Sequence, residues 1–282
     1  MNLAPSSRKS VSGAATIEEI RLRLKSDFGI HIRPENNTML EARLSKLARS
    51  LGLTGLDALA KHLQVHPEAL DVSDLADRMT TNYTYFHREN AHYDYLVESA
   101  LPQVLAARKR AGQIDLKVWC AAASSGEEPY ELAMWIREAL SKENVHYPAG
   151  LLATDISSKV LDVARKGEYA AAAVAKLPDA LIRRYFTKLP SGAMRVTPEL
   201  HADVTFRRFN LMSPLPFRSQ FDIIFCRNVM IYFDRETIHD LLERLYEKTV
   251  PGGFLFVGLS ESFDRKRCPY TVVRPGIYRR SP

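Results

Sequence analysis

One segment of this chain, Cys120 to Tyr130, restricts the possible folds more than any other. Its sequence is CAAASSGEEPY, and it stands between the apolar run Ile114–Trp119 and the helical pattern Glu131–Leu140. An apolar strand, a turn of small residues and a helix start, in this order, form the repeating unit of doubly wound α/β domains. We therefore expect an α/β domain in which one strand ends at this turn.

The residues of the turn favour one class of ligand. The small residues Ala121–Gly126 let a ligand approach the backbone, and the helix N-terminus behind them offers unpaired N–H groups. Glu127 and Glu128 would repel a diphosphate, whereas a carboxylate suits a ribose hydroxyl or a cationic ligand. The turn taken alone is equally consistent with close packing of helix on sheet. If a cofactor binds here, the residues favour S-adenosylmethionine.

Length and apolar patterning indicate a globular protein with more than one domain. The chain has 282 residues, of which 46% are hydrophobic, enough to bury a large core. No run of about 18 apolar residues appears, and the start MNLAPSSRKSVSG has no apolar core like that of a signal peptide. We therefore expect a cytoplasmic protein that is not inserted in a membrane.

Cysteine spacing argues against a zinc-binding or disulfide-rich protein, and the distribution of charge argues against a nucleic-acid-binding protein. Cys120, Cys226 and Cys268 are far apart, without the pairs typical of zinc sites or disulfide frameworks, so we expect no metal. The net charge of +6 is spread along the chain. This spread disfavours a nucleic-acid partner and is compatible with an acidic protein partner.

The predicted organisation has three parts. Residues 1–14 are expected to be a disordered tail, and residues 15–92 a helical N-terminal domain. Residues 93–282 alternate strands and helices, with a small β insertion at about 185–204 and a final hairpin around Pro275-Gly276 that adds an antiparallel edge. The strands are predicted at 116–121, 150–154, 204–209, 221–226 and 254–258.

The second predicted helix, which starts at Pro34, has a basic flank. Leucines at positions 40, 44, 47 and 51 form a stripe at helical spacing, and Arg43, Lys46 and Arg49 lie beside it. A solvated charged face is the usual explanation of such a pattern. The alternative is a surface that binds an acidic partner.

Several polar residues stand where α/β domains bind ligands. Asp155 ends the strand LLATD and is either the acidic residue that holds ribose hydroxyls or the N-cap of the next helix. Arg227, Asn228 and Tyr232 follow the buried strand of FDIIFCRNVMIYF. The segment TTNYTYFHRE, residues 80–89, concentrates hydrogen-bonding groups at the expected domain junction, where ligand sites are common.

The motifs together resemble one family. TNYTYFHRE, VWCAAASSGEEPYELAM, ATDISSKVLDVARKGEY, FNLM, FDIIFCRNVMIYFD and GGFLFVGLSESF occur in the order and spacing of the CheR family of chemotaxis receptor methyltransferases. The resemblance extends from about residue 16 to 280. It implies a Rossmann-like methyltransferase domain that uses S-adenosylmethionine to methylate glutamate side chains of methyl-accepting chemotaxis receptors, with S-adenosylhomocysteine as the second product.

The resemblance also implies roles for individual residues. Arg88 and Tyr232 are expected at the methyl-transfer site. An ionised glutamate, with an ordinary pKa of about 4.3, needs no general base. The expected cofactor contacts are Asn82, Thr84, Arg88, Glu128, Asp155, Asn210, Leu211, Arg227 and Asn228.

Two features differ from the family pattern. His87 stands where a second Phe is usual, which introduces a pH-sensitive group. The stretch Thr187–Met194 is short, which disfavours docking of a receptor C-terminal pentapeptide.

Two other functions remain to be weighed. A module that senses S-adenosylmethionine or a nucleotide is disfavoured by the retention of Arg88 and Tyr232, and a nucleic-acid or small-molecule methyltransferase by the lack of an Asn/Asp-Pro-Pro-Tyr motif.

Overall fold

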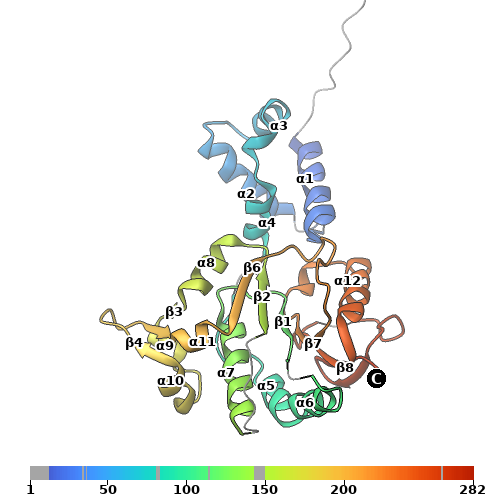
Figure 1. Cartoon of the computed structure of the whole chain (residues 1–282). Coiled ribbons are helices and arrows are strands. Elements are labelled where there is room, and N and C mark those ends of the chain that lie inside the picture. Colours follow the sequence, from blue (N-terminus) through green and yellow to red (C-terminus); the bar gives the residue numbers. More distant parts are fainter. Residues whose placement is uncertain are drawn as a thin grey trace, which may run out of the picture. The chain divides into compact units, whose positions relative to one another are not determined.

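The computed structural model describes residues 13–33, 35, 37–80, 83–113, 115–142, 150–261 and 263–282. The chain divides into two compact units, Met1–Thr81 and Asn82–Pro282 (Figure 1). Of the residues predicted to form a disordered tail, 1–12 lie outside the described ranges, and Gly13 already belongs to the first helix. Pro34 and Asn82 also lie outside these ranges.

The first unit is helical, as predicted. Leu24, Leu40 and Leu44 are almost completely buried at its centre, and Ala76 packs with them. The predicted leucine stripe is therefore the core face of its helix, although Leu51 at its end is exposed. The elements are α1 (Gly13–Phe28), α2 (Asn37–Ser50), α3 (Leu56–Val65), η2 (Pro67–Ala69) and α4 (Val72–Met79).

The second unit is built on a mostly parallel sheet with the strand order β6-β2-β1-β7-β8-β10-β9. Strands β6, β2, β1, β7 and β8 are parallel, and the hairpin β9–β10 adds the predicted antiparallel edge. The fold class is confirmed. The strands are β1 (Val118–Cys120), β2 (Leu151–Asp155), β6 (Val204–Arg208), β7 (Phe221–Phe225), β8 (Thr249–Phe256), β9 (Thr271–Arg274) and β10 (Ile277–Arg279).

Helices cover both faces of this sheet. One apolar cluster includes Tyr130 and Met134 of α7, and the other includes Leu241 and Leu245 of α12. Continuous burial of all five residues of β7 is typical of a strand between two helical layers. The helices are α5 (Ala91–Tyr95), η3 (Leu96–Ala100), α6 (Leu101–Arg110), α7 (Glu127–Lys142), α8 (Ser158–Lys166), α9 (Ala171–Val174), α10 (Asp179–Tyr185), α11 (Pro198–His201), η4 (Met230–Tyr232) and α12 (Arg235–Lys248).

The strand order defines where a ligand binds. Strand β1 pairs with β2 on one side and with β7 on the other, so the direction of the chain across the sheet reverses between β1 and β7. Ligands of open α/β sheets bind at such a switch point, outside the carboxyl ends of the strands. The residues that follow β1, β2 and β7 are therefore the first candidates.

A second, three-stranded sheet with the order β3-β5-β4 lies between α8 and β6 in the chain. Its strands are β3 (Glu168–Tyr169), β4 (Phe186–Lys188) and β5 (Met194–Val196). The β insertion predicted at about 185–204 corresponds to β4 and β5. Strand β3 was not predicted, because two residues are too short to show a strand period.

The boundary between the units differs from the predicted division between residues 92 and 93. Phe86 is completely buried in the core of the second unit, where its ring lies 5.0 Å from that of Tyr169 and 5.8 Å from that of Phe186. The segment that starts at Tyr83 therefore belongs to the sheet-containing unit. In the described part of the chain, no helix combines the length and the apolar character needed to cross a bilayer.

Candidate functional site

The turn between β1 and α7 is shaped by close packing. Gly126 has a φ of 98°, and a Cβ atom at this position would lie 2.7 Å from the Tyr169 hydroxyl and 2.8 Å from the Cβ of Ala164. The Tyr169 hydroxyl donates a hydrogen bond of 2.8 Å to the Ser125 carbonyl. Gly126 is thus explained by packing.

Asp155, at the end of β2, connects two of the loops at the switch point. It is buried, and its Oδ2 accepts the N–H of Ser124 at 2.8 Å while its Oδ1 accepts the N–H of Ser157 at 2.9 Å. Ser157 is the N-cap of α8, because its side chain accepts the N–H of Val160. The structure thus assigns the N-cap of α8 to Ser157, and Asp155 lies at the carboxyl end of β2.

Asn210 and Leu211 follow β6 beside Asp155. The Phe209 N–H donates to the Asp155 carbonyl at 2.9 Å, which joins the two strand ends. The Asn210 Oδ1 accepts the N–H of Met212 at 3.0 Å and shapes the turn that buries Leu211. The predicted contacts Asp155, Asn210 and Leu211 are therefore brought together.

Arg227 is the centre of a second, buried group. Its side chain is completely buried, and its Nη1 lies 2.9 Å from the Glu128 carboxylate. Its Nη2 donates to the Arg88 carbonyl at 2.6 Å and lies 3.2 Å from the Glu89 carboxylate. Arg227 thus joins the end of β7 to α7 and to the turn at 86–90.

The two carboxylates around Arg227 differ in their electrostatics. Burial raises the pKa of Glu128, and the Arg227 charge opposes this rise. For Glu89, burial also favours the neutral form, but the Arg227 charge and the Asn228 amide outweigh it and lower the pKa. The Cys120 thiol donates to Glu128 at 3.2 Å, yet 12% of the Glu128 side chain remains exposed. Glu128 is therefore held inside the site with an edge open to a ligand.

Arg88 lies on an unusual turn. The residues on either side, His87 and Glu89, have φ values of 66° and 57°, in the left-handed region. Non-glycine residues in sparsely populated backbone regions cost on the order of 1–3 kcal/mol each. The Arg88 Nη1 donates to the Tyr83 carbonyl at 2.9 Å, and the guanidinium lies 5.8 Å from the centre of the Tyr85 ring.

Glu261 organises the segment that follows β7, and sequence reasoning missed it. Its carboxylate accepts the N–H groups of Asn228 at 2.9 Å, Met230 at 2.7 Å and Gly258 at 2.5 Å. Burial raises its pKa, against the effect of these backbone donors. The available signal was an acidic residue shortly after the strand that ends in GGFLF.

The remaining predicted site residues are placed as follows. Thr84 is partly buried in the segment without regular secondary structure that precedes the Arg88 turn, and Tyr232 is partly buried in η4. The Asn228 Nδ2 donates to Glu89 at 3.3 Å, which includes Asn228 in the Arg227 group. The predicted receptor-binding residues Arg43, Lys46 and Arg49 all lie on α2, in the first unit.

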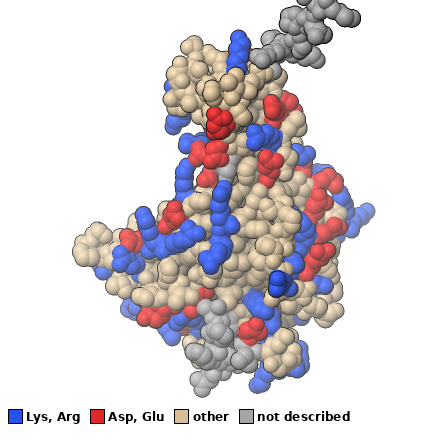
Figure 2. Space-filling view, turned by 45° about the horizontal axis from the view of Figure 1, so that its top comes forward, with Lys and Arg blue, Asp and Glu red and all other residues tan. Residues whose placement is uncertain are grey.

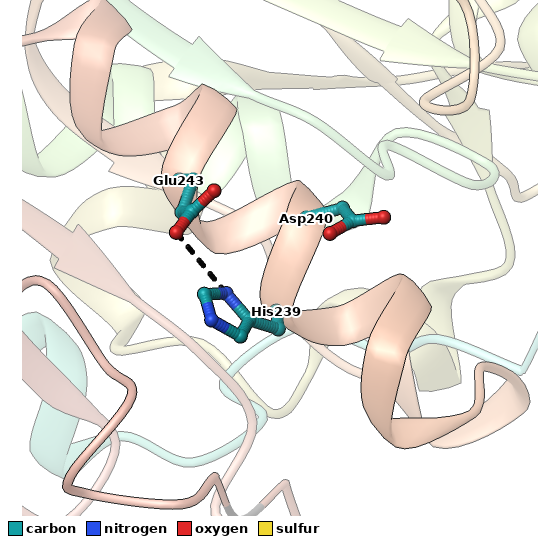
Figure 3. A group of neighbouring side chains, drawn as sticks. All are labelled: His239, Asp240 and Glu243. Carbon is teal, nitrogen blue, oxygen red and sulfur yellow. Dashed lines mark ion pairs between the residues drawn. The ribbon is translucent and has the colours of Figure 1, made fainter.

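Within the described residues, one group of three side chains is close enough to share a metal ion: His239, Asp240 and Glu243. All three come from α12. Figure 3 shows that His239 and Glu243 point toward one another, 3.5 Å apart, while Asp240 points away. An ion pair at i and i+4 with a partly buried histidine and an exposed glutamate is typical of a helix surface, so we assign no metal to it.

Comparison with known proteins identifies both units. Residues 15–80 match the model of the CheR methyltransferase all-alpha domain, and residues 82–275 that of the CheR methyltransferase SAM binding domain. The chain is 33% identical to a chemotaxis protein methyltransferase of Borreliella burgdorferi, covering 91% of this chain and 90% of the relative. It is 34% identical to chemotaxis protein methyltransferase Cher2 of Pseudomonas putida, covering 94% and 98%.

Chemotaxis protein methyltransferase 1 of Pseudomonas aeruginosa is also 34% identical, over 95% of this chain and 98% of the relative. The matches span both units in the order of the family. They confirm the resemblance inferred from the motifs, and they confirm S-adenosylmethionine as the cofactor of the second unit. This chain belongs to the CheR methyltransferase family.

Proposed function

We propose that this chain transfers the methyl group of S-adenosylmethionine to glutamate side chains in the cytoplasmic domains of chemoreceptors. The products are glutamyl methyl esters and S-adenosylhomocysteine. The observation that carries the proposal is the buried Arg227, which holds both Glu128 and the Arg88 turn at the switch point of a CheR SAM binding domain. A cofactor-binding group and a substrate-binding group are thereby held by one side chain.

The donor set fits the cofactor. Asp155 at the end of β2 and Glu128 in the first turn of α7 present hydrogen-bond acceptors and negative charge. Such groups suit ribose hydroxyls and a cationic methionyl group and oppose a diphosphate. S-adenosylmethionine supplies the methyl group. The remaining contacts are assigned to Asn82, Thr84, Arg88, Asn210, Leu211, Arg227 and Asn228.

Arg88 and Tyr232 are assigned to the acceptor glutamate. Its carboxylate is already ionised near neutral pH, so the site needs to orient it rather than deprotonate it. Arg88 attracts and aligns the carboxylate, and the Tyr232 hydroxyl donates a hydrogen bond to it. Two backbone contacts support this role: the His87 N–H donates to Glu131, and Arg227 donates to the Arg88 carbonyl. They hold the backbone from which the Arg88 side chain extends.

One assay separates the candidate functions. Methyl-labelled S-adenosylmethionine is incubated with the chain and a receptor cytoplasmic domain, with Arg88→Ala as the control enzyme. We expect label on the receptor that mild base releases as methanol. Cofactor binding without transfer would instead favour a sensory module, and a base-stable label would favour another class of methyltransferase.

The basic flank of α2 is assigned to the receptor. Arg43 and Lys46 line a groove of about 420 Å³ that Asp71, Asp74 and Arg78 also line, and Arg78 forms an ion pair with Asp74 at 2.6 Å. Such a surface suits a helix that carries glutamates. On the face drawn in Figure 2, basic and acidic side chains are interspersed, without the continuous basic stripe expected for a nucleic-acid partner.

Binding of this chain to its receptor is proposed not to require a pentapeptide at the receptor's C-terminus. In the β4–β5 hairpin, the Leu189 N–H donates to the Ala193 carbonyl at 2.8 Å, so the connection is a closed turn. Strand β4, at the edge of the small sheet, has three residues. An added peptide strand needs a row of exposed N–H and C=O groups, and this edge offers few of them.

A further inference from the structure

A buried carboxylate lies behind the Arg88 turn and belongs to none of the assigned contacts. The Glu131 side chain, on α7, is completely buried. Its Oε2 accepts the backbone N–H of His87 at 2.5 Å, and its Oε1 lies 3.0 Å from the Nδ1 of the same histidine. The Trp135 Nε1 donates to Oε1 at 3.2 Å. Among the described residues, His87 is the ionisable base that pairs with Glu131.

This contact acts on the backbone of Arg88. The turn around Arg88 contains two left-handed non-glycine residues, which persist only where the surroundings hold them. Glu131 holds the turn on the N-terminal side of Arg88 through His87, and Arg227 holds it at the Arg88 carbonyl and at Glu89. Loss of either contact releases one end of the turn.

We propose that His87 and Glu131 are positioning residues which hold Arg88 in place for methyl transfer, and that ionisation of this pair makes the transfer depend on pH. The inference rests on the proposed function. It concerns residues that contact neither reactant directly, and it joins two positions that lie 44 residues apart in the chain.

The charges around His87 determine whether methyl transfer rises or falls with increasing pH. The hydrogen bond to Glu131 raises the pKa of His87, burial opposes it, and the Glu131 and Asp94 charges add to the rise. Tyr93, which also faces Glu131, is kept neutral because burial raises its pKa. Because the pKa of His87 is raised, the ion pair is present below that pKa and is lost as pH rises through it. Transfer should therefore fall on the alkaline side.

The test compares pH profiles of kcat/KM for wild type, His87→Gln and Glu131→Gln. Formation of S-adenosylhomocysteine is measured, because the ester product is itself labile in base. We expect wild type to lose activity as pH rises through the pKa of His87, by up to about a hundredfold, the effect of displacing an orienting group by about 1 Å. His87→Gln, which keeps a neutral side chain at every pH, should have a lower and flat profile.

The matched control is His66→Gln. His66 pairs with Glu68 at 3.1 Å on the exposed surface of the first unit, so this variant should follow the wild-type profile. If Glu131→Gln fails to fold, His87→Gln still decides the question because its side chain is partly exposed. A His87→Gln profile identical to wild type would overturn the inference.

A spectroscopic readout separates this inference from the proposed function. Because Trp135 donates to Glu131, its fluorescence should change with pH at the midpoint of the activity loss, and the change should vanish in His87→Gln. If the fluorescence titrates but the chain transfers no methyl group to receptors, the His87–Glu131 inference stands and the proposed receptor methylation is refuted. Methyl transfer without any His87-dependent fluorescence change or alkaline transition would reject the pair and keep the function.

Discussion

The guanidinium of Arg227 and the carboxylate of Glu128 form a buried ion pair with a separation of 2.9 Å between Nη1 and Oε2. The pair joins the carboxyl end of β7 to the first turn of α7, the helix that follows the neighbouring strand β1. It therefore determines how the two sides of the switch point face each other.

Removal of Arg227 should destabilise the second unit strongly. Arg227→Ala leaves Glu128 and Glu89 buried without their counter-charge, which typically costs about 3–5 kcal/mol of unfolding free energy. Urea unfolding measures this cost. The control is Arg267→Ala, which breaks the exposed pair with Glu236 and should barely move the midpoint. Similar midpoints for both variants would contradict the assignment of Arg227.

Asp155→Ala should weaken binding of S-adenosylhomocysteine. The product lacks the transferred methyl and the sulfonium charge but keeps the ribose, and loss of hydrogen bonds to a charged group costs about 1.5–3 kcal/mol. Calorimetry with Asp162→Ala, an exposed residue of α8, as the control measures the difference. Equal affinity for Asp155→Ala and wild type would place the ribose elsewhere.

Arg88→Ala and Tyr232→Phe should lower methyl transfer and leave the fold intact, since both side chains are assigned to orient reactants. Arg88→Lys should restore little activity, because a lysine lacks the planar fork that aligns a carboxylate. Single-turnover rates and thermal unfolding provide the two measurements. Unchanged rates in both Arg88→Ala and Tyr232→Phe would support the sensory module instead.

A triple charge reversal of Arg43, Lys46 and Arg49 to Glu should raise the apparent KM for the receptor more than it changes cofactor affinity. The effect should be largest at low salt, where surface charges are least screened. The control reverses Arg23, Lys25 and Lys61 on α1 and α3. Normal methylation by the α2 variant at low salt would show that its basic flank is simply solvated.

Deletion of a receptor's C-terminal pentapeptide should leave methylation unchanged. The closed β4–β5 turn and the short β4 edge offer little backbone for an added strand. Titration of the free pentapeptide provides a second measurement. Micromolar binding, or lost methylation after deletion of the tail, would refute the pentapeptide-independent assignment.

Local sequence determined the element types and the family. The strand, turn and helix around Cys120–Tyr130 and the strand end at Asp155 are patterns of neighbouring residues, so they can be read without the fold. The leucine stripe predicted the core face of α2 for the same reason. Six such motifs in one order were sufficient to indicate the CheR family.

Only the tertiary structure decided which buried charges meet. Glu131 with His87, Glu128 with Arg227, and Glu261 with the segment after β7 are partners that sequence spacing does not reveal. Strand order and the packing of α7 bring them together, and a buried charge then requires a partner wherever the fold supplies one. The boundary at residue 81 has the same origin, because the burial of Phe86 assigns its turn to the second unit.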